Sequence, residues 1–470
     1  MIESKGRAAG GTEYSWCRAV PSGTGITVLA ILTNKMPETT KLQDALSKLQ
    51  TFHPILRSRL HANNPSKNSF SFVTSSTPFV QVKSFNLLST SKILESSENI
   101  SVSPLQLILE HELNQNDWSN LNRSKCINVS DVFFASTYAL PNGKFVLVLR
   151  LHVTACDRTS AVALLRELLV LGGQGEGERK ETVMKEIIGN EGEVNLAIED
   201  MIPKGKNKKG LLTRGMDMLS YSVNSLRSSS LKFTDAKSAR SSEVVRFQLN
   251  KDNTDRILQE CKSRGIKLCG AIAAAGVIAE HNNYLKRSNS DHHHHQRKYA
   301  VVTLTDCRSI LDPPLSNHSF GFYHSAVMNT HVIKGGEKLW DLAQKMYMAF
   351  ANAKNCNKHF SDMADLNFLM CRAIENPNLT PSSSLRSSFM SIFEDTVIDD
   401  SDETMQQKVG LEDYMGCASV HGIGPSIAVF DTIRDGQLDC ICVYPSPLHS
   451  REQVQALVEN MKNVLIGIGE

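Results

Sequence analysis

The sequence lacks several features that mark specialised classes of protein. None of its 470 residues fall in an apolar stretch of about eighteen or more, so we expect no transmembrane helix. The first residues, Met1–Arg7, lack the apolar run of a signal peptide. The formal net charge is only +2, which gives no case for a surface that binds nucleic acid or membranes. No internal repeat is present.

The cysteines lack the spacing of a disulfide framework or of a metal site. There are eleven of them, an odd number, scattered along the chain without a CxxC pair. The closest two are Cys440 and Cys442. This pattern is typical of reduced thiols, so we expect a cytoplasmic protein.

Length and composition predict a soluble globular protein with more than one lobe. Hydrophobic residues make up 41% of the chain and charged residues 21%. A chain of 470 residues exceeds the usual size of one domain. We expect an N-terminal lobe over 1–185, a crossover linker over 186–240 and a C-terminal lobe over 241–470.

Hydrophobic periodicity predicts alternating strands and helices, which is an α/β pattern. In the first half, one amphipathic helix carries Leu42, Ala45, Leu46 and Leu49. A second carries Ala161, Leu164, Leu165 and Leu168 and stops at Gly172–Gly173. The residues of the crossover are mainly Gly, Lys, Glu and Ser, with ordered pieces at 197–203 and 218–223. The other elements that we expect are strands over 25–32, 69–73, 132–138, 144–153, 243–249, 299–305, 426–430 and 438–443, and helices over 253–264, 270–280 and 451–466.

Five segments, taken together and in order, resemble a known superfamily. They are Leu46–Arg57 with its His53-Pro54 pair, Leu149–Asp157 with the leucine-rich helix after it, Ile266–Ala275, Asp306–Arg308 followed by Asn317–Tyr323, and Ser419–Gly424. The set is similar to the CoA-dependent acyltransferases, which include BAHD enzymes, condensation domains and alcohol acetyltransferases. It looks most like a plant, condensation-domain-like branch, because no DFGWG-type segment is present.

The resemblance implies both a fold and a reaction. The fold would be α/β, with two chloramphenicol-acetyltransferase-like lobes, each a mixed sheet with flanking helices, around a central channel. An acyl-CoA co-substrate would donate its acyl group to a small-molecule alcohol or amine. No metal or resident cofactor, no nucleic acid and no membrane span are implied, and we expect a monomer.

The signature of this superfamily, HHxxxDG, is incomplete in this chain. In the family, the second His is the general base and the Asp pairs with an Arg that orders the loop. Aligned on Asp157, the first His is His152, but Val153 stands at the position of the base and Arg158 at that of the glycine. We take His152 and Asp157 as catalytic candidates, with Arg308 as the partner of Asp157. Further channel-lining or structural candidates are Val153, Arg308, Asn317, Gly321, His324 and His421.

Strand geometry predicts that His152 does not take over from the missing base. Side chains alternate between the faces of a strand, so Arg150 and His152 share one face and Val153 lies on the other. General-base catalysis contributes about 10²–10⁴ to a rate, so its loss would leave positioning and oxyanion stabilisation.

Three hypotheses therefore stay open. A bulge near Thr154–Ala155 re-aims His152 as the base. Alternatively, another imidazole acts as the base, with His318, His324 and His421 as the candidates. In the third, acyl transfer has been lost and the protein is a ligand-binding or protein-interaction module.

Other reactive residue types have simpler interpretations. Cys156 is disfavoured as a nucleophile, because the neighbouring carboxylate of Asp157 raises the pKa of a thiol. His53, before a proline, is interpreted as structural. The four histidines of 292–295 have no second ligand cluster, so we expect a solvated loop rather than a metal site.

Overall fold

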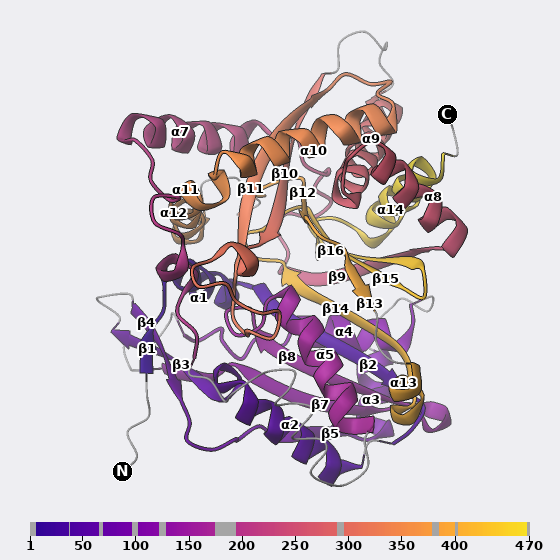
Figure 1. The fold of residues 1–470 in the computed structure, drawn as a ribbon. Coiled ribbons are helices and arrows are strands. Elements are labelled where there is room, and N and C mark those ends of the chain that lie inside the picture. The colour runs from indigo at the N-terminus through magenta and orange to yellow at the C-terminus, as the bar shows by residue number, and fades with distance from the viewer. Residues whose placement is uncertain are drawn as a thin grey trace. The chain divides into compact units, whose positions relative to one another are not determined.

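The structure is a computed structural model. It describes residues 6–36, 38–64, 69–95, 102–121, 128–173, 194–288, 296–377, 385–399 and 403–467. The chain forms two compact units (Figure 1). The first comprises Met1–Met201, Arg308–Tyr323 and Asp400–Ser419, and the second Ile202–Cys307, His324–Asp399 and Val420–Glu470. The boundary expected at 185 lies outside the described residues.

The first unit is built on two sheets. A five-stranded sheet has the order β14-β2-β8-β7-β5, and a four-stranded sheet has the order β1-β4-β3-β6. In the larger sheet β8 is antiparallel to both β2 and β7, whereas β5 is parallel to β7. The strands are β1 (Gly6–Ala8), β2 (Thr24–Thr33), β3 (Ser58–Asn64), β4 (Ser69–Thr74), β5 (Val82–Phe85), β6 (Asn128–Asp131), β7 (Phe133–Ala139), β8 (Phe145–His152) and β14 (Leu411–Val420).

Helices cover the five-stranded sheet of this unit. α4 packs on β2 and β8, and α5 packs against α2 and α13. α5 has its leucines on the buried side, with Leu164 fully buried, as its sequence pattern predicts. The helices are α1 (Gly11–Ala19), α2 (Thr39–Phe52), α3 (Leu87–Glu95), α4 (Pro104–Leu113), α5 (Arg158–Gly173) and α13 (Glu403–Val409), with short 3-10 turns η1 (Val20–Ser22), η2 (Pro54–Arg57), η3 (Pro141–Gly143), η4 (Ile198–Met201) and η5 (Arg308–Ile310).

The second unit is built on one mixed seven-stranded sheet. The strand order is β11-β10-β12-β15-β16-β9, and β13 pairs with β15. β10, β12 and β15 run parallel, and the outer pairs are antiparallel. The strands are β9 (Ser241–Leu249), β10 (Arg297–Asp306), β11 (His324–Ile333), β12 (Met390–Phe393), β13 (Val397–Asp399), β15 (Ile427–Arg434) and β16 (Gln437–Ser446).

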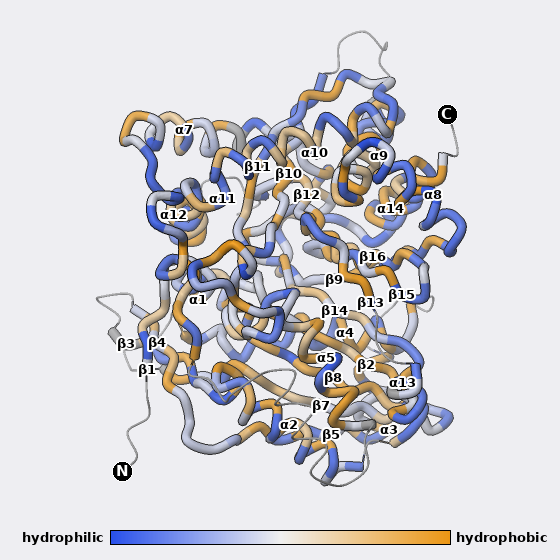
Figure 2. The backbone as a smooth tube through the Cα atoms, viewed as in Figure 1, coloured by the Kyte–Doolittle hydropathy of each residue, from blue (hydrophilic) through white to orange (hydrophobic). Residues whose placement is uncertain are grey.

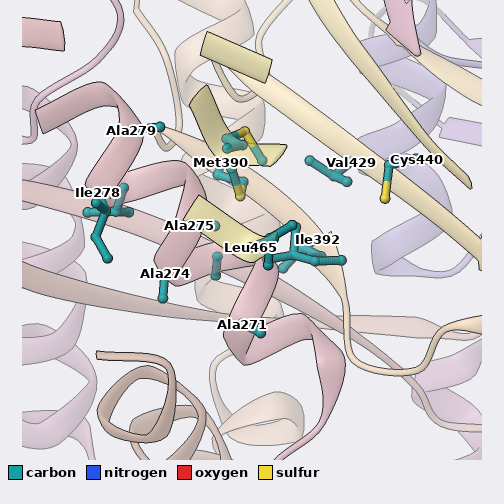
Figure 3. Packing of buried hydrophobic residues seen from close by; sticks show 14 of the residues in the cluster. Ala271, Ala274, Ala275, Ile278, Ala279, Met390, Ile392, Val429, Cys440 and Leu465 are labelled. Atoms are coloured by element: carbon teal, nitrogen blue, oxygen red, sulfur yellow. The ribbon is translucent and has the colours of Figure 1, made fainter. Parts of the chain in front are cut away.

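The core of the second unit lies around the small-residue helix α9. Figure 3 shows its alanines among Met390, Ile392 and Val429 of the sheet. A Cβ on Gly276 would lie 2.2 Å from Cε of Met390, so a larger residue there would require the Met390 side chain to move. The helices are α7 (Leu211–Arg227), α8 (Lys251–Ser263), α9 (Leu268–Ser288), α10 (Leu339–Asn355), α11 (Lys358–Ser361), α12 (Met363–Glu375) and α14 (Arg451–Ile466).

The structure confirms the α/β class and most of the expected elements. The helix expected over 451–466 is α14, with the same bounds, and the strand expected over 243–249 is β9. The crossover contains more order than its composition indicates, because α7 extends well beyond the expected piece at 218–223. β11, β14 and α10 were not among the expected elements.

Candidate functional site

The strand that carries the incomplete signature ends at His152 without a bulge in its pairing. β2 and β8 pair in unbroken register from Thr33↔Phe145 to Ile26↔His152. Arg150 and His152 both contact Trp118. The guanidinium carbon of Arg150 lies 5.8 Å from the centroid of the Trp118 ring, and the centroid of the His152 ring lies 5.3 Å from it. The two side chains therefore share one face, as the alternation predicts.

His152 lies in an environment that keeps its imidazole neutral. The side chain is fully buried. The backbone N–H of Thr154 donates to Nδ1 at 3.3 Å, and the Thr154 hydroxyl lies 2.7 Å from the same nitrogen. Nδ1 is therefore the acceptor and the ring proton is on Nε2, which has no hydrogen-bond partner among the described residues. Burial lowers the pKa of His152 to about 3. This geometry is typical of a structural histidine.

Val153, at the position of the family base, lies in an apolar cluster. Its backbone N–H donates to the carbonyl of Gly25 at 3.1 Å. A Cβ on Gly25, whose φ is +98°, would lie 3.0 Å from both Cγ1 of Val153 and the ring of Trp16. The Trp16 ring lies 5.2 Å from that of Phe322. A hydrocarbon therefore occupies this position, and a hydrocarbon accepts no proton.

Asp157 fixes the turn between β8 and α5. Its Oδ1 accepts from the backbone N–H of Ser160 at 3.0 Å, so Asp157 caps α5. Its Oδ2 accepts from the backbone N–H of Tyr323 at 2.9 Å. The backbone N–H of Asp157 in turn donates to the carbonyl of Gly321 at 3.1 Å. One aspartate thereby joins the loop, the helix and the segment before Tyr323.

Arg308 is the partner of Asp157, as predicted from the resemblance. Its Nη2 donates to Asp157 Oδ1 at 2.9 Å, and both side chains are 1% exposed. Nη2 also lies 3.0 Å from the Ser160 hydroxyl and from the Ser319 carbonyl. Arg308–Tyr323 belongs to the first unit, so this pair lies within one unit. A buried ion pair persists only when further hydrogen bonds satisfy both groups, as they do here.

The segment 317–323 runs as a loop whose aromatic side chains are buried. Phe320 stacks on His53 with ring centroids 3.8 Å apart. Gly321 has a φ of +147°, and a Cβ there would lie 2.7 Å from the ring of Tyr323, so this position requires glycine. Asn317 is exposed. The predicted site residues Asp157, Arg308 and Gly321 are thus brought together, with Asn317 at the edge of their segment.

A buried carboxylate links two histidines of the first unit. Glu167 Oε2 lies 2.6 Å from His53 Nε2, and Glu167 Oε1 lies 2.7 Å from His318 Nδ1. Burial alone would raise the pKa of Glu167, but the hydrogen bonds of His318 and His53 outweigh it and lower that pKa. The His318 side chain is 27% exposed, whereas those of His53 and Glu167 are buried. Glu167 therefore orients a partly accessible imidazole.

The sequence interpretation did not include Glu167 in the site. The sequence does contain a signal for Glu167. It is a charged residue among the leucines that the pattern places on the buried side of the predicted helix, three residues after Leu164. A buried carboxylate requires partners. The identity of those partners, His53 and His318, depends on two segments far away in the sequence.

Cys156 does not have the environment of a nucleophile. The thiol is fully buried. Burial raises its pKa well above the ordinary value, and the adjacent Asp157 carboxylate adds to the effect. A protonated, buried thiol is unreactive.

His324 and His421 belong to the second unit. His324 is 5% exposed and contacts the Phe393 ring edge-on at 5.5 Å. His421 Nδ1 lies 2.9 Å from the Ser242 hydroxyl, and burial, followed by the charges of Arg386 and Arg240, lowers the pKa of His421 to about 4. Whether either imidazole takes part in a reaction stays a prediction.

Within the described ranges, no group of His, Cys, Asp and Glu side chains is arranged to hold a metal ion. The histidines of 292–295 lie outside those ranges.

Comparison with solved structures identifies the fold. Trichothecene 15-O-acetyltransferase (TRI3) from Fusarium sporotrichioides superposes with a TM-score of 0.68 at 12% identity, over 99% of this chain and 95% of that chain. Polyketide synthase associated protein 5 from Mycobacterium tuberculosis gives a TM-score of 0.63 at 17% identity, over 100% of this chain and 99% of that one. The condensation domain of the Monacolin K polyketide synthase gives 0.60 at 11% identity, over 98% and 97%.

Sequence comparison adds nothing to this result, because no protein-family model and no curated protein matches the chain. Identities of this size show the fold alone. The chain therefore has the two-lobed α/β fold that acyltransferases and condensation domains share.

Proposed function

We propose that this protein binds an acyl thioester, such as an acyl-CoA, and has lost histidine-dependent acyl transfer. The proposal rests on one contrast: the residues that order the loop after β8 are intact, whereas the residue at the position of the base is a hydrocarbon. Asp157 and Arg308, which order the loop, form a complete buried network. Val153, at the position of the base, lies against Gly25 and Trp16.

The chemistry of acyl transfer gives the reason. An alcohol or amine attacks the thioester carbonyl, a tetrahedral oxyanion forms, and the CoA thiol leaves. An alcohol must lose its proton during the attack, and a positioned base contributes about 10²–10⁴ to that step. Val153 has no proton acceptor, and His152 is fully buried with its pKa lowered to about 3, so neither side chain supplies such a base. Transfer to an amine would be slowed least by the loss of the base, because a neutral amine attacks before it loses a proton.

The donor, the cellular compartment, the oligomeric state and the cofactor requirement are proposed as the sequence predicts them. We propose that the donor is a CoA thioester, that the protein acts as a cytoplasmic monomer and that it needs no resident cofactor. The absence of a DFGWG-type segment is the observation that favours the plant, condensation-domain-like branch.

The test separates binding from turnover. Isothermal titration with a panel of acyl-CoAs, from acetyl to long-chain, measures binding, and release of free CoA thiol measures turnover. We expect saturable binding of at least one donor by the wild-type protein, with thiol release close to background. Val153→His should raise thiol release in the presence of an alcohol acceptor by about 10²-fold or more.

Val153→Asn is the matched control, because it places a polar group at this position without an imidazole. Circular dichroism shows whether both variants fold. Wild-type thiol release that disappears in His152→Ala would contradict the proposal. Absence of binding by every donor, as measured on the folded wild-type protein, would refute it as well.

Acyl transfer to an alcohol or amine is the second candidate function. The specific observation in its favour is His318, whose partly exposed imidazole is held by the buried Glu167 carboxylate. A carboxylate that orients a histidine in this way stabilises the imidazolium formed on proton uptake.

This candidate makes its own prediction. Wild-type thiol release would then exceed background and decrease by about 10²-fold in His318→Gln. His61→Gln, on β3 and also partly exposed, is the control and should leave the rate unchanged. Equal rates for the two variants would exclude His318 as the base.

A further inference from the structure

The side of α7 that packs against α12 is polar and charged. Arg214 Nε lies 2.5 Å from Asp365 Oδ1. Tyr221 donates to Asp362, and Asp217 lies 2.7 Å from Lys209 Nζ. The side chains of Asp362 and Asp365 are 3% and 1% exposed. Buried carboxylates therefore anchor α7 through its polar residues.

The other side of α7 is apolar and faces solvent. Leu212, Met216 and Leu219 are 86%, 73% and 66% exposed. Their spacing of four and three residues places them along one face, which we call the α7 stripe. Figure 2 shows hydrophobic segments alternating with hydrophilic ones along α7. Leu211, the first residue of the helix, is 86% exposed as well.

This orientation is the reverse of that of an ordinary surface helix. Such a helix buries its apolar face and exposes its charged face. A contiguous exposed apolar patch marks an interaction site. The α7 stripe therefore has the exposure and composition of an interaction surface.

The charged residues in and before α7 are mostly basic. Lys204, Lys206 and Lys208, in the turn before α7, are exposed. Between 204 and 227 the chain has six basic residues, Lys204, Lys206, Lys208, Lys209, Arg214 and Arg227, and a single acidic residue, Asp217. Asp217 pairs with Lys209 on the inward side. The net charge of the whole chain is only +2, so it does not indicate this local excess of positive charge.

We propose that the α7 stripe and the lysines before it dock this protein on an anionic lipid surface. An apolar face flanked by basic residues is the arrangement that inserts into the head-group region and attracts anionic lipids. A second copy fits less well, because two such faces would bring like charges together. Among the described residues, no helix is long and apolar enough to cross a bilayer. The docking is therefore peripheral, and it is independent of the proposed acyl-thioester binding.

Vesicle flotation of the full chain tests the proposal. With vesicles of 70% phosphatidylcholine and 30% phosphatidylserine at low salt, we expect the protein to float. With pure phosphatidylcholine it should remain largely unbound. Leu212→Ser/Met216→Ser/Leu219→Ser and, separately, Lys204→Gln/Lys206→Gln/Lys208→Gln should each weaken partitioning about tenfold or more.

Two control variants match these changes. Leu87→Ser/Leu88→Ser alters two exposed leucines at the start of α3, and Lys262→Gln/Lys334→Gln/Lys338→Gln removes three exposed lysines of the second unit. Both controls should partition like the wild-type protein. Because all substituted residues are exposed, circular dichroism spectra should be unchanged.

Three results would overturn the proposal. The first is absence of flotation with anionic vesicles, and the second is an equal loss in the stripe variant and the Leu87→Ser/Leu88→Ser control. The third is light scattering that shows a dimer which the stripe variant converts to monomer, since the stripe would then be the contact between two copies.

Discussion

Buried carboxylates organise both the β8–α5 turn of the first unit and the α7 region of the second, with opposite consequences. At the turn, Asp157 accepts from two backbone N–H groups as well as from Arg308. In the α7 region, the groups that reach Asp362 and Asp365 are side chains, among them those of Lys209, Arg214 and Tyr221.

The difference lies in what each network fixes. Bonds to the backbone fix the path of the chain, and the apolar side chains around the turn, such as Val153, are buried with it. Bonds to side chains fix which way a helix faces, and here they leave its apolar side in solvent. The first network preserves an internal scaffold, whereas the second presents a surface.

The largest expected effect tests the network at the turn. Arg308→Ala leaves the Asp157 carboxylate buried without its cation, so we expect a loss of about 3–5 kcal/mol in the free energy of unfolding. Chemical denaturation followed by fluorescence measures the loss. Arg59→Ala, which removes the exposed pair with Asp131, is the control and should cost about 1 kcal/mol or less. Equal losses in the two variants would mean that the buried network does not hold the turn.

A smaller effect is expected in the α7 region. Asp365→Ala removes the acceptor of Lys209 and Arg214, but Lys209 keeps its contacts with Asp217 and Asp362. We expect a loss of about 2–3 kcal/mol and faster hydrogen exchange in α7.

Glu375→Ala, in the same helix α12, removes an exposed pair with Arg372 and serves as the control. Unchanged exchange of α7 in Asp365→Ala would contradict the idea that the carboxylates of α12 orient α7.

The smallest effect concerns pH and the imidazole beside the turn. The pKa of His152 is about 3 in the folded protein and ordinary, about 6.5, in the unfolded chain. Between these values the unfolded chain binds the proton, so His152 lowers stability as the pH falls below about 6.5. From pH 7 to pH 5 this contribution is about 2 kcal/mol.

The measurement compares wild type with His152→Gln, which does not titrate. The wild-type protein should lose about 2 kcal/mol more than the variant between pH 7 and pH 5. Parallel stability curves for the two proteins would show that His152 is already accessible to protons in the folded state.

Local patterns of sequence predicted a large part of the fold. α14 and β9 follow from periodicity, and the common face of Arg150 and His152 follows from strand alternation. β11 and β14 were missed because their sequences mix polar and apolar residues, and their pairing partners supply what defines them as strands. The pairing of Asp157 with Arg308 came from resemblance, since 151 positions separate the two residues.

The sequence alone determined the chemistry available at each position. It placed a hydrocarbon at 153, where the family has a base, and an apolar stripe with basic neighbours in α7. Only the tertiary structure decided which side of α7 is buried. An amphipathic pattern alone favours burial of the apolar side. The reverse orientation came from Asp362 and Asp365, about 150 residues further along the chain, because a buried carboxylate is stable only with partners close by.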